Sequence, residues 1–264
     1  MATTISESGT TVHYVATGGG KPLVLVHGAG GNSEANWAHL RDRFHDRRLV
    51  ITPNYAGSGE TTDPGGDIDV HLAVEQVAAA IRAADAGPVE LVGFSLGSVV
   101  SAAVAAKHPE LVKKLVLIAG WATHTDSRQE LAIGLWRKLA DGDLDSYRRF
   151  ITLYLFSPKH LGAQGREAIE RGLEQVDVTP NVIRQIELVQ RVNIEALVPE
   201  IVIPTLVIGL TQDQLIPVEH ARALHEAIGG SVYREIDSGH LVVWERPDEL
   251  VREILGFLDE PAAT

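Results

Sequence analysis

The chain of 264 residues is long enough for one large domain, or for one domain that carries an insertion. Its formal net charge of −12, from 23 Lys and Arg against 35 Asp and Glu, makes nucleic acids and anionic lipid surfaces poor partners. The absence of cysteine excludes disulfides, thiolate metal sites and a cysteine nucleophile. Because the sequence shows no secretion signal and no apolar run long enough to cross a bilayer, we expect a cytoplasmic protein without membrane insertion.

The predicted strands come in two groups. Two short runs at 3–6 and 10–16 flank a Glu-Ser-Gly turn and predict an N-terminal hairpin. Six further runs rich in β-branched residues predict strands at 22–28, 49–55, 89–94, 114–120, 204–210 and 231–237. Amphipathic helices are predicted between them at 70–81, 98–106, 217–228 and 247–258. This alternation predicts an α/β fold, with a mainly parallel eight-stranded sheet and helices on both faces.

One connection is too long for a simple crossover. More than eighty residues without a convincing strand separate Gly120 from Pro204, whereas a crossover normally needs one helix and short loops. The predicted helices in this insertion cover 128–140, 143–156, 166–176 and 181–192. Two faces in it keep helical spacing and are expected to be buried, formed by Leu131, Leu135 and Leu139 and by Tyr147, Ile151 and Tyr154. The expected organisation is a core at 1–121 and 197–264 and a helical cap at 122–196.

The pentapeptide Gly93-Phe94-Ser95-Leu96-Gly97 has the pattern G-x-S-x-G. With the composition of this chain, about 0.1 accidental matches to this pattern are expected, so the pentapeptide alone is weak evidence for a catalytic serine. Its position between predicted elements strengthens that evidence. The pentapeptide ends a predicted strand and precedes a helix of small residues. A strand that turns sharply into a helix strains the serine backbone and exposes Oγ at the helix N-terminus. Ser95 is therefore the predicted nucleophile; the alternative is a helix N-cap serine between packing glycines.

A serine hydroxyl needs a base to act as a nucleophile at neutral pH. His240 follows the last predicted strand, where its loop reaches the same edge of the sheet as Ser95. Several other histidines lie on predicted helices, namely His45, His71, His220 and His225. Asp213 follows the strand at 204–210 and could orient the imidazole and stabilise its charged form. Asp237 competes with it, but lies on the same segment as His240, whereas a triad acid must approach the imidazole from the side opposite Ser95.

Glycines follow the first strand of the second group, in the sequence HGAGG at 27–31. They let the chain pass close to the nucleophile, so that the backbone amides of Ala29 and Leu96 would form an oxyanion hole. A generic glycine turn is the alternative reading. His27 is expected to be structural. Trp121, where the core strand enters the insertion, and Phe94, beside the serine, are the predicted substrate contacts.

Together these motifs resemble the α/β-hydrolase superfamily, in its capped branch of serine esterases and carbon–carbon bond hydrolases. The resemblance covers essentially the whole core, through HGAGG, GFSLG, KHPELVKKLVLIAG, GLTQDQLIP and SGHLVVWERPDEL. It implies a triad in the family order Ser95, Asp213, His240, and cleavage of an acyl bond without a cofactor. Two positions depart from the family pattern, because Asn54 stands where relatives usually carry Asp, and Ala56 where they carry a bulky residue.

The favoured function is a cofactor-independent serine hydrolase that cleaves an ester or thioester of a small-to-medium acyl substrate through an acyl-enzyme. The alternative is a carbon–carbon bond hydrolase, or a biosynthetic cyclase or lyase, on the same fold. A non-catalytic ligand receptor is less favoured because a binder needs no triad. The sequence contains no metal-ligand spacing and no G-x-G-x-x-G motif. The expected partner is a small-molecule substrate, and a homodimer is left open.

Overall fold

The computed structural model describes residues 1–123 and 126–261, and its centre is a sheet with the strand order β1-β2-β4-β3-β5-β6-β7-β8. β1 (Ala2–Ile5) and β2 (Thr11–Gly18) form a hairpin, and β2 pairs antiparallel with β4. The other pairs are parallel and join β3 (Lys21–Val26), β4 (Arg48–Pro53), β5 (Val89–Phe94), β6 (Val112–Ile118), β7 (Thr205–Leu210) and β8 (Val232–Ile236). The predicted eight-stranded, mainly parallel sheet is thus confirmed.

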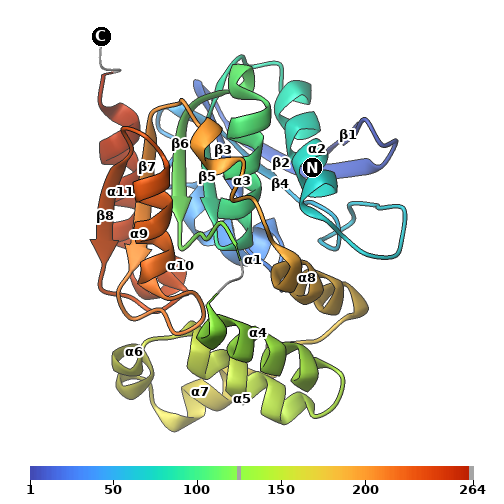
Figure 1. Ribbon diagram of the computed structural model, residues 1–264, viewed down its shortest axis with the longest axis vertical. Coiled ribbons are helices and arrows are strands. Elements are labelled where there is room, and N and C mark those ends of the chain that lie inside the picture. Colours follow the sequence, from blue (N-terminus) through green and yellow to red (C-terminus); the bar gives the residue numbers. More distant parts are fainter. Residues whose placement is uncertain (124–125, 262–264) are drawn as a thin grey trace.

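Alternate side chains of the central strands enter two apolar cores. Val24 and Val26 of β3 belong to the core that includes α2 (Val70–Ala83), α3 (Leu96–Lys107) and α9 (Val218–Ala227). Leu23 and Leu25 belong to the core that includes α1 (Ser33–Arg41), α10 (Val242–Glu245) and α11 (Pro247–Asp259). Successive strand residues point to opposite faces, so both faces of the sheet are buried and the strands are apolar at nearly every position. Figure 1 shows these helices around the sheet.

The segment between β6 and β7 is helical, as expected. Its described residues form α4 (Ser127–Ala140), α5 (Leu144–Leu155), α6 (Pro158–Ala163), α7 (Arg166–Glu174) and α8 (Pro180–Arg191). Side-chain oxygens cap several of these helices at their N-termini, those of Asp126, Asp143, Ser157 and Thr179. In Figure 1 the inserted helices lie together beyond one end of the sheet, with α8 nearest to the core. In the described parts of the chain, no helix is long and apolar enough to span a bilayer.

The buried face of α4 differs from the predicted one. Leu131 and Leu135 are 76% and 44% exposed, whereas Ile133 and Trp136 are buried. Ile133 and Trp136 belong to the core shared with α5 and α8, and of the predicted face only Leu139, which is half-buried, packs against this core. Periodicity identifies apolar residues at helical spacing but not which of them meet a partner.

Two further predictions on the helices have different outcomes. The predicted face of α5 is right for Tyr147 and Ile151, which are buried, while Tyr154 is half-buried. His45 was expected on a helix, but α1 ends at Arg41 and His45 lies in the turns that follow. The residues at 42–47 all lie in turns, and β4 follows them directly.

Candidate active site

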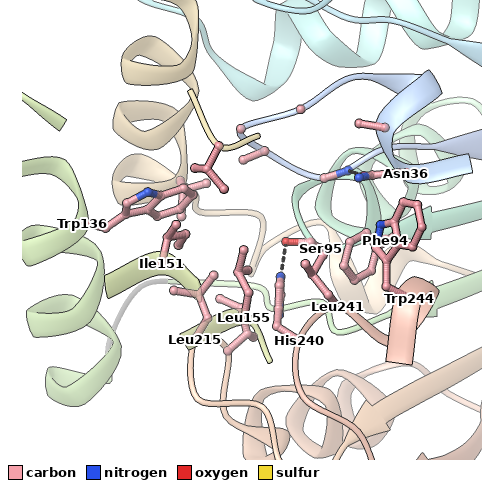
Figure 2. A pocket seen from close by; sticks show the side chains of 18 of the residues that line it. Asn36, Phe94, Ser95, Trp136, Ile151, Leu155, Leu215, His240, Leu241 and Trp244 are labelled. Atoms are coloured by element: carbon pink, nitrogen blue, oxygen red, sulfur yellow. Dashed lines mark hydrogen bonds between the residues drawn. The ribbon is translucent and has the colours of Figure 1, made fainter. Parts of the chain in front are cut away.

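Four segments meet at the edge of the sheet where the parallel strands end. β3 leads into the loop at 27–31, β5 into Ser95, β7 into the loop of Asp213, and β8 into the loop of His240. The carboxyl ends of parallel strands share one edge, so residues far apart in the sequence come together there. Figure 2 shows Ser95 facing His240, with Trp136 and Ile151 on one side of the pair and Asn36 and Trp244 on the other.

Ser95 lies in the tight turn between β5 and α3. Its backbone has φ 56° and ψ −123°, a conformation that non-glycine residues rarely adopt. A Cβ atom on Gly93 would collide with the carbonyl of Gly97, and one on Gly97 with the carbonyl of Val26, so the turn requires both glycines. Within the described chain, Ser95 Oγ contacts His240 and does not cap α3, which argues against the N-cap reading.

His240 connects Ser95 to Asp213. Its Nε2 lies 2.9 Å from Ser95 Oγ, and its Nδ1 lies 2.6 Å from Asp213 Oδ2. An ionised carboxylate can only accept hydrogen bonds, so Nδ1–H donates to Asp213 and Nε2 is left to accept the Ser95 proton. Asp213 Oδ1 accepts from the amides of Leu215 and Ile216 at 2.9 and 2.8 Å. Three hydrogen bonds thus orient a carboxylate whose side chain is 0% exposed.

The competing carboxylate, Asp237, lies elsewhere. Its side chain is 60% exposed, and its Oδ1 accepts a hydrogen bond of 3.2 Å from Thr211 Oγ1. Arg246 lies 4.0 Å from its other oxygen. The structure therefore brings Asp213, and not Asp237, to the imidazole of His240.

The glycine-rich loop at 27–31 passes directly over Ser95. A Cβ atom on Gly28 would lie only 3.0 Å from the Ser95 Cβ. The amides of Gly28 and Gly30 donate to the side chains of Asn36 and Gln185, both at 2.8 Å. Among the described residues, the amide of Ala29 between them has no hydrogen-bond acceptor, nor has that of Leu96 at the start of α3. Two amides without acceptors in the described part of the chain, both beside a serine hydroxyl, are the kind of donors that an oxyanion hole needs.

A cavity of about 370 Å³ opens at Ser95. Phe94 and Trp121, the predicted substrate contacts, both line it. Its wall on the side of the inserted helices is apolar and aromatic, and includes Trp136, Tyr147, Ile151, Leu155 and Val189. Among the described residues that line it, Asp177 is the one carboxylate, and there is no Lys or Arg. In the described chain, no three His, Asp or Glu side chains gather where they could hold a metal ion.

The two departures from the family pattern both lie beside the glycine-rich loop. Asn54 Oδ1 accepts a hydrogen bond of 2.9 Å from the amide of Ser33, at the start of α1. The Ala56 amide donates to Gln76 Oε1 at 2.7 Å, and its carbonyl accepts from Gln185 Nε2 at 3.3 Å. Both positions make structural hydrogen bonds, and the contacts of Ser95 with His240 form with them in place.

His27 is buried behind the site and does not line the described part of the cavity. Its ring stacks on Tyr55 with centroids 4.1 Å apart, and Nδ1–H donates to the Gly28 carbonyl at 2.8 Å. Burial lowers the pKa of His27 to about 4, and the hydrogen bond to Gly28 offsets only part of this effect. These contacts agree with a structural role for a neutral imidazole.

We expect His27 to make the protein less stable in acid. Unfolded His27 takes up a proton below about pH 6.5, whereas the folded residue stays neutral until about pH 4. The unfolded state binds more protons in this window, so the free energy of unfolding falls as the pH is lowered from 6.5 to 4, by up to about 3 kcal/mol from this residue. Urea denaturation between pH 4 and 7 should give a shallower pH dependence for His27→Gln than for the wild type. Equal slopes would exclude this contribution.

Comparisons with known proteins agree with this architecture. A family model described as alpha/beta hydrolase fold matches residues 21–158, more than half of the chain. The chain is 38% identical over 250 residues to Pyrrolizixenacetamide deacetylase of Xenorhabdus hominickii, covering 94% of each chain. It is 33% identical over 135 residues to (E)-2-((N-methylformamido)methylene)succinate hydrolase of Acinetobacter baylyi (strain ATCC 33305 / BD413 / ADP1), covering 51% of each. The crystal structure of MGS-M2, an alpha/beta hydrolase enzyme from a Medee basin deep-sea metagenome library, superposes with a TM-score of 0.88 at 20% identity, over 97% of this chain and 96% of that one.

Proposed function

Because this chain belongs to the α/β-hydrolase fold family, we propose that it is a serine hydrolase in which Ser95 attacks the carbonyl carbon of an acyl substrate. The observation that carries the proposal is the hydrogen-bonded row from Asp213 through His240 to Ser95, with contacts of 2.6 and 2.9 Å. Ser95, at the end of this chain of hydrogen bonds, lines a largely apolar cavity in which a substrate carbonyl would reach the serine hydroxyl.

The reaction would proceed in two halves. As Ser95 Oγ bonds to the carbonyl carbon, His240 Nε2 takes its proton, Asp213 stabilises the imidazolium, and the amides of Ala29 and Leu96 hold the oxyanion. His240 then donates the proton to the leaving group, whose bond to the carbonyl carbon breaks, and Ser95 is left acylated. In the second half, His240 takes a proton from water as that water attacks the acyl-enzyme. The bond between Ser95 Oγ and the acyl carbon then breaks as His240 Nε2 returns its proton to Oγ, and the acid product leaves.

The proposed substrate is an ester or thioester with a small-to-medium, uncharged acyl group. A cavity of about 370 Å³ with largely apolar walls suits such a group. We propose that residues 122–196 act as a cap over a core formed by 1–121 and 197–264. Its aromatic side chains, together with Trp121 and Phe94, would then contact the substrate and set its size and shape.

Hydrolysis of an amide is the second candidate. The relative from Xenorhabdus hominickii is named as a deacetylase and aligns with 94% of this chain at 38% identity. The same residues would serve, because His240 can protonate an amine leaving group as it would an alkoxide. The amide candidate therefore differs in the leaving group and not in the roles of Ser95, His240 and Asp213.

The experiment that tests the proposed function is a substrate panel with a covalent trap. Purified protein should turn over para-nitrophenyl esters, thioesters or N-acetyl anilides steadily, and mass spectrometry of quenched samples should find an acyl group on the Ser95 peptide. Turnover of vinylogous diketones alone, without an acylated peptide, would instead indicate a carbon–carbon bond hydrolase. Binding of these compounds without turnover of any class would indicate a receptor.

A matched pair of acyl groups tests the charge preference of the cavity. Para-nitrophenyl butyrate and para-nitrophenyl hemisuccinate have acyl chains of similar length, but the second carries a carboxylate. Because no Lys or Arg is among the described lining residues, that carboxylate would lose water without gaining a cation, so kcat/KM should be at least about tenfold lower. The methyl ester of the hemisuccinate is the neutral control, and it should react like the butyrate. Equal or faster hydrolysis of the hemisuccinate would contradict this preference.

A further inference from the structure

Gln185 of α8 joins the inserted helices to two loops of the core. Its side-chain amide is fully buried, at 0% exposure, and each of its polar atoms has a partner. Oε1 accepts from the Gly30 amide at 2.8 Å, and Nε2 donates to Ser58 Oγ at 2.6 Å and to the Ala56 carbonyl at 3.3 Å. Removing a buried amide of this kind leaves several polar groups without partners, so the contact is energetically significant.

Gln185 also reaches the glycine-rich loop by a second route. The hydroxyl of Ser58, which accepts from Gln185, itself donates to the Gly31 carbonyl at 3.2 Å. Gln185 packs closely against Gly57 in the loop that follows β4. A Cβ atom on Gly57 would lie 3.2 Å from the Gln185 Cγ, so the glycine leaves room for this side chain. The loop at 28–31 is therefore held at Gly30 directly and at Gly31 through Ser58.

The opposite side of the same loop is held by α1. Asn36 Oδ1 accepts from the Gly28 amide at 2.8 Å. The amides on both sides of Ala29 are thus each bonded to a side-chain oxygen, one from α1 and one from α8. These bonds orient the His27–Gly28 and Ala29–Gly30 peptide planes, which lie on either side of the Gly28–Ala29 plane that carries the Ala29 N–H. Among the described residues this N–H has no acceptor, and it lies beside Ser95.

We propose that Gln185 is a positioning residue, which holds the loop at 28–31 so that the Ala29 amide remains directed at the oxyanion. This inference rests on the proposed function. Gln185 is not among the described residues that line the cavity, so its effect on turnover would pass through the loop and not through contact with substrate. The inserted helices would then have a role beyond substrate choice, since α8 completes the geometry of the oxyanion hole.

The test compares three variants by steady-state kinetics. Gln185→Leu removes all three hydrogen bonds and should lower kcat about 10- to 100-fold, with KM within about threefold, because a displaced oxyanion donor weakens transition-state binding. Ser58→Ala removes only the indirect link and should cause a smaller loss of kcat. The matched control on the same helix is Arg184→Gln, which breaks the contact of Arg184 with Asp63 but touches no residue of the loop. Its kcat should stay near that of the wild type.

A second measurement does not depend on activity. Hydrogen–deuterium exchange of the peptide at 27–36 should be faster in Gln185→Leu than in the wild type and in Arg184→Gln. If Gln185→Leu does not fold, Ser58→Ala should still show faster exchange of this peptide together with its smaller loss of kcat.

Three results would overturn the inference. The first is an equal loss of kcat in Gln185→Leu and Arg184→Gln, which would reduce Gln185 to a docking residue of α8. The second is faster exchange with unchanged kcat, and the third is unchanged exchange. If the wild type hydrolysed no acyl substrate, the proposed function would fail, and the exchange comparison would still decide whether Gln185 holds the loop.

Discussion

Replacing Ser95 with Ala should lower the turnover of acyl substrates by several orders of magnitude, on the order of 10⁴-fold or more, because in the proposed mechanism the Ser95 hydroxyl forms the acyl-enzyme. The fold should persist. Ala has the same Cβ in the same strained turn, and the variant loses only the 2.9 Å hydrogen bond to His240. The unfolding free energy should change by no more than about 1 kcal/mol. Burst-phase and steady-state kinetics on a para-nitrophenyl ester, together with urea denaturation, measure both quantities.

Ser101→Ala is the matched control for this experiment. Ser101 lies on α3, and its buried hydroxyl has no hydrogen-bond partner among the described residues. It also does not line the described cavity, so removing this hydroxyl should leave turnover near that of the wild type. A folded Ser95→Ala variant that hydrolyses the ester at the wild-type rate would refute the nucleophile assignment.

Replacing Asp213 with Asn should lower turnover by a factor of about 10² to 10⁴. The amide keeps the shape of the carboxylate, and its oxygen can still accept from Leu215 and Ile216. Its nitrogen then faces His240 Nδ1 as a donor. This favours the tautomer that carries its proton on Nε2, which cannot accept the Ser95 proton. The loss should appear mainly in kcat, measured on the same ester.

Asp237→Asn is the control for the acid. It changes the same chemical group on the segment of His240, where the side chain is largely exposed and bonded to Thr211. Its turnover should stay within about threefold of the wild type, as expected for a group that does not touch the imidazole. A larger loss in Asp237→Asn than in Asp213→Asn would transfer the acid role to Asp237.

Local signals in the sequence were sufficient for the architecture. The central strands are recognisable because both of their faces are buried, which makes nearly every position apolar. The turn at Ser95 is recognisable because Gly93 and Gly97 are positions where a Cβ atom would collide with backbone carbonyls. Parallel strands end at one edge of the sheet, so the order of the motifs along the chain already predicted that Ser95 and His240 would lie close together.

Which residues from distant parts of the chain contact one another was shown only by the tertiary structure. Asp213 and Asp237 both follow strands, and only the packing of their loops directs Asp213 at His240. The buried face of α4 depended on which of its apolar residues met α5 and α8. Gln185 lies 155 residues from Gly30, and its one local signal is a polar residue on the buried face of α8 beside Ile186 and Val189. Strand and turn preferences arise from neighbouring residues and can be read along the chain, whereas a hydrogen bond between distant segments depends on how those segments pack in three dimensions.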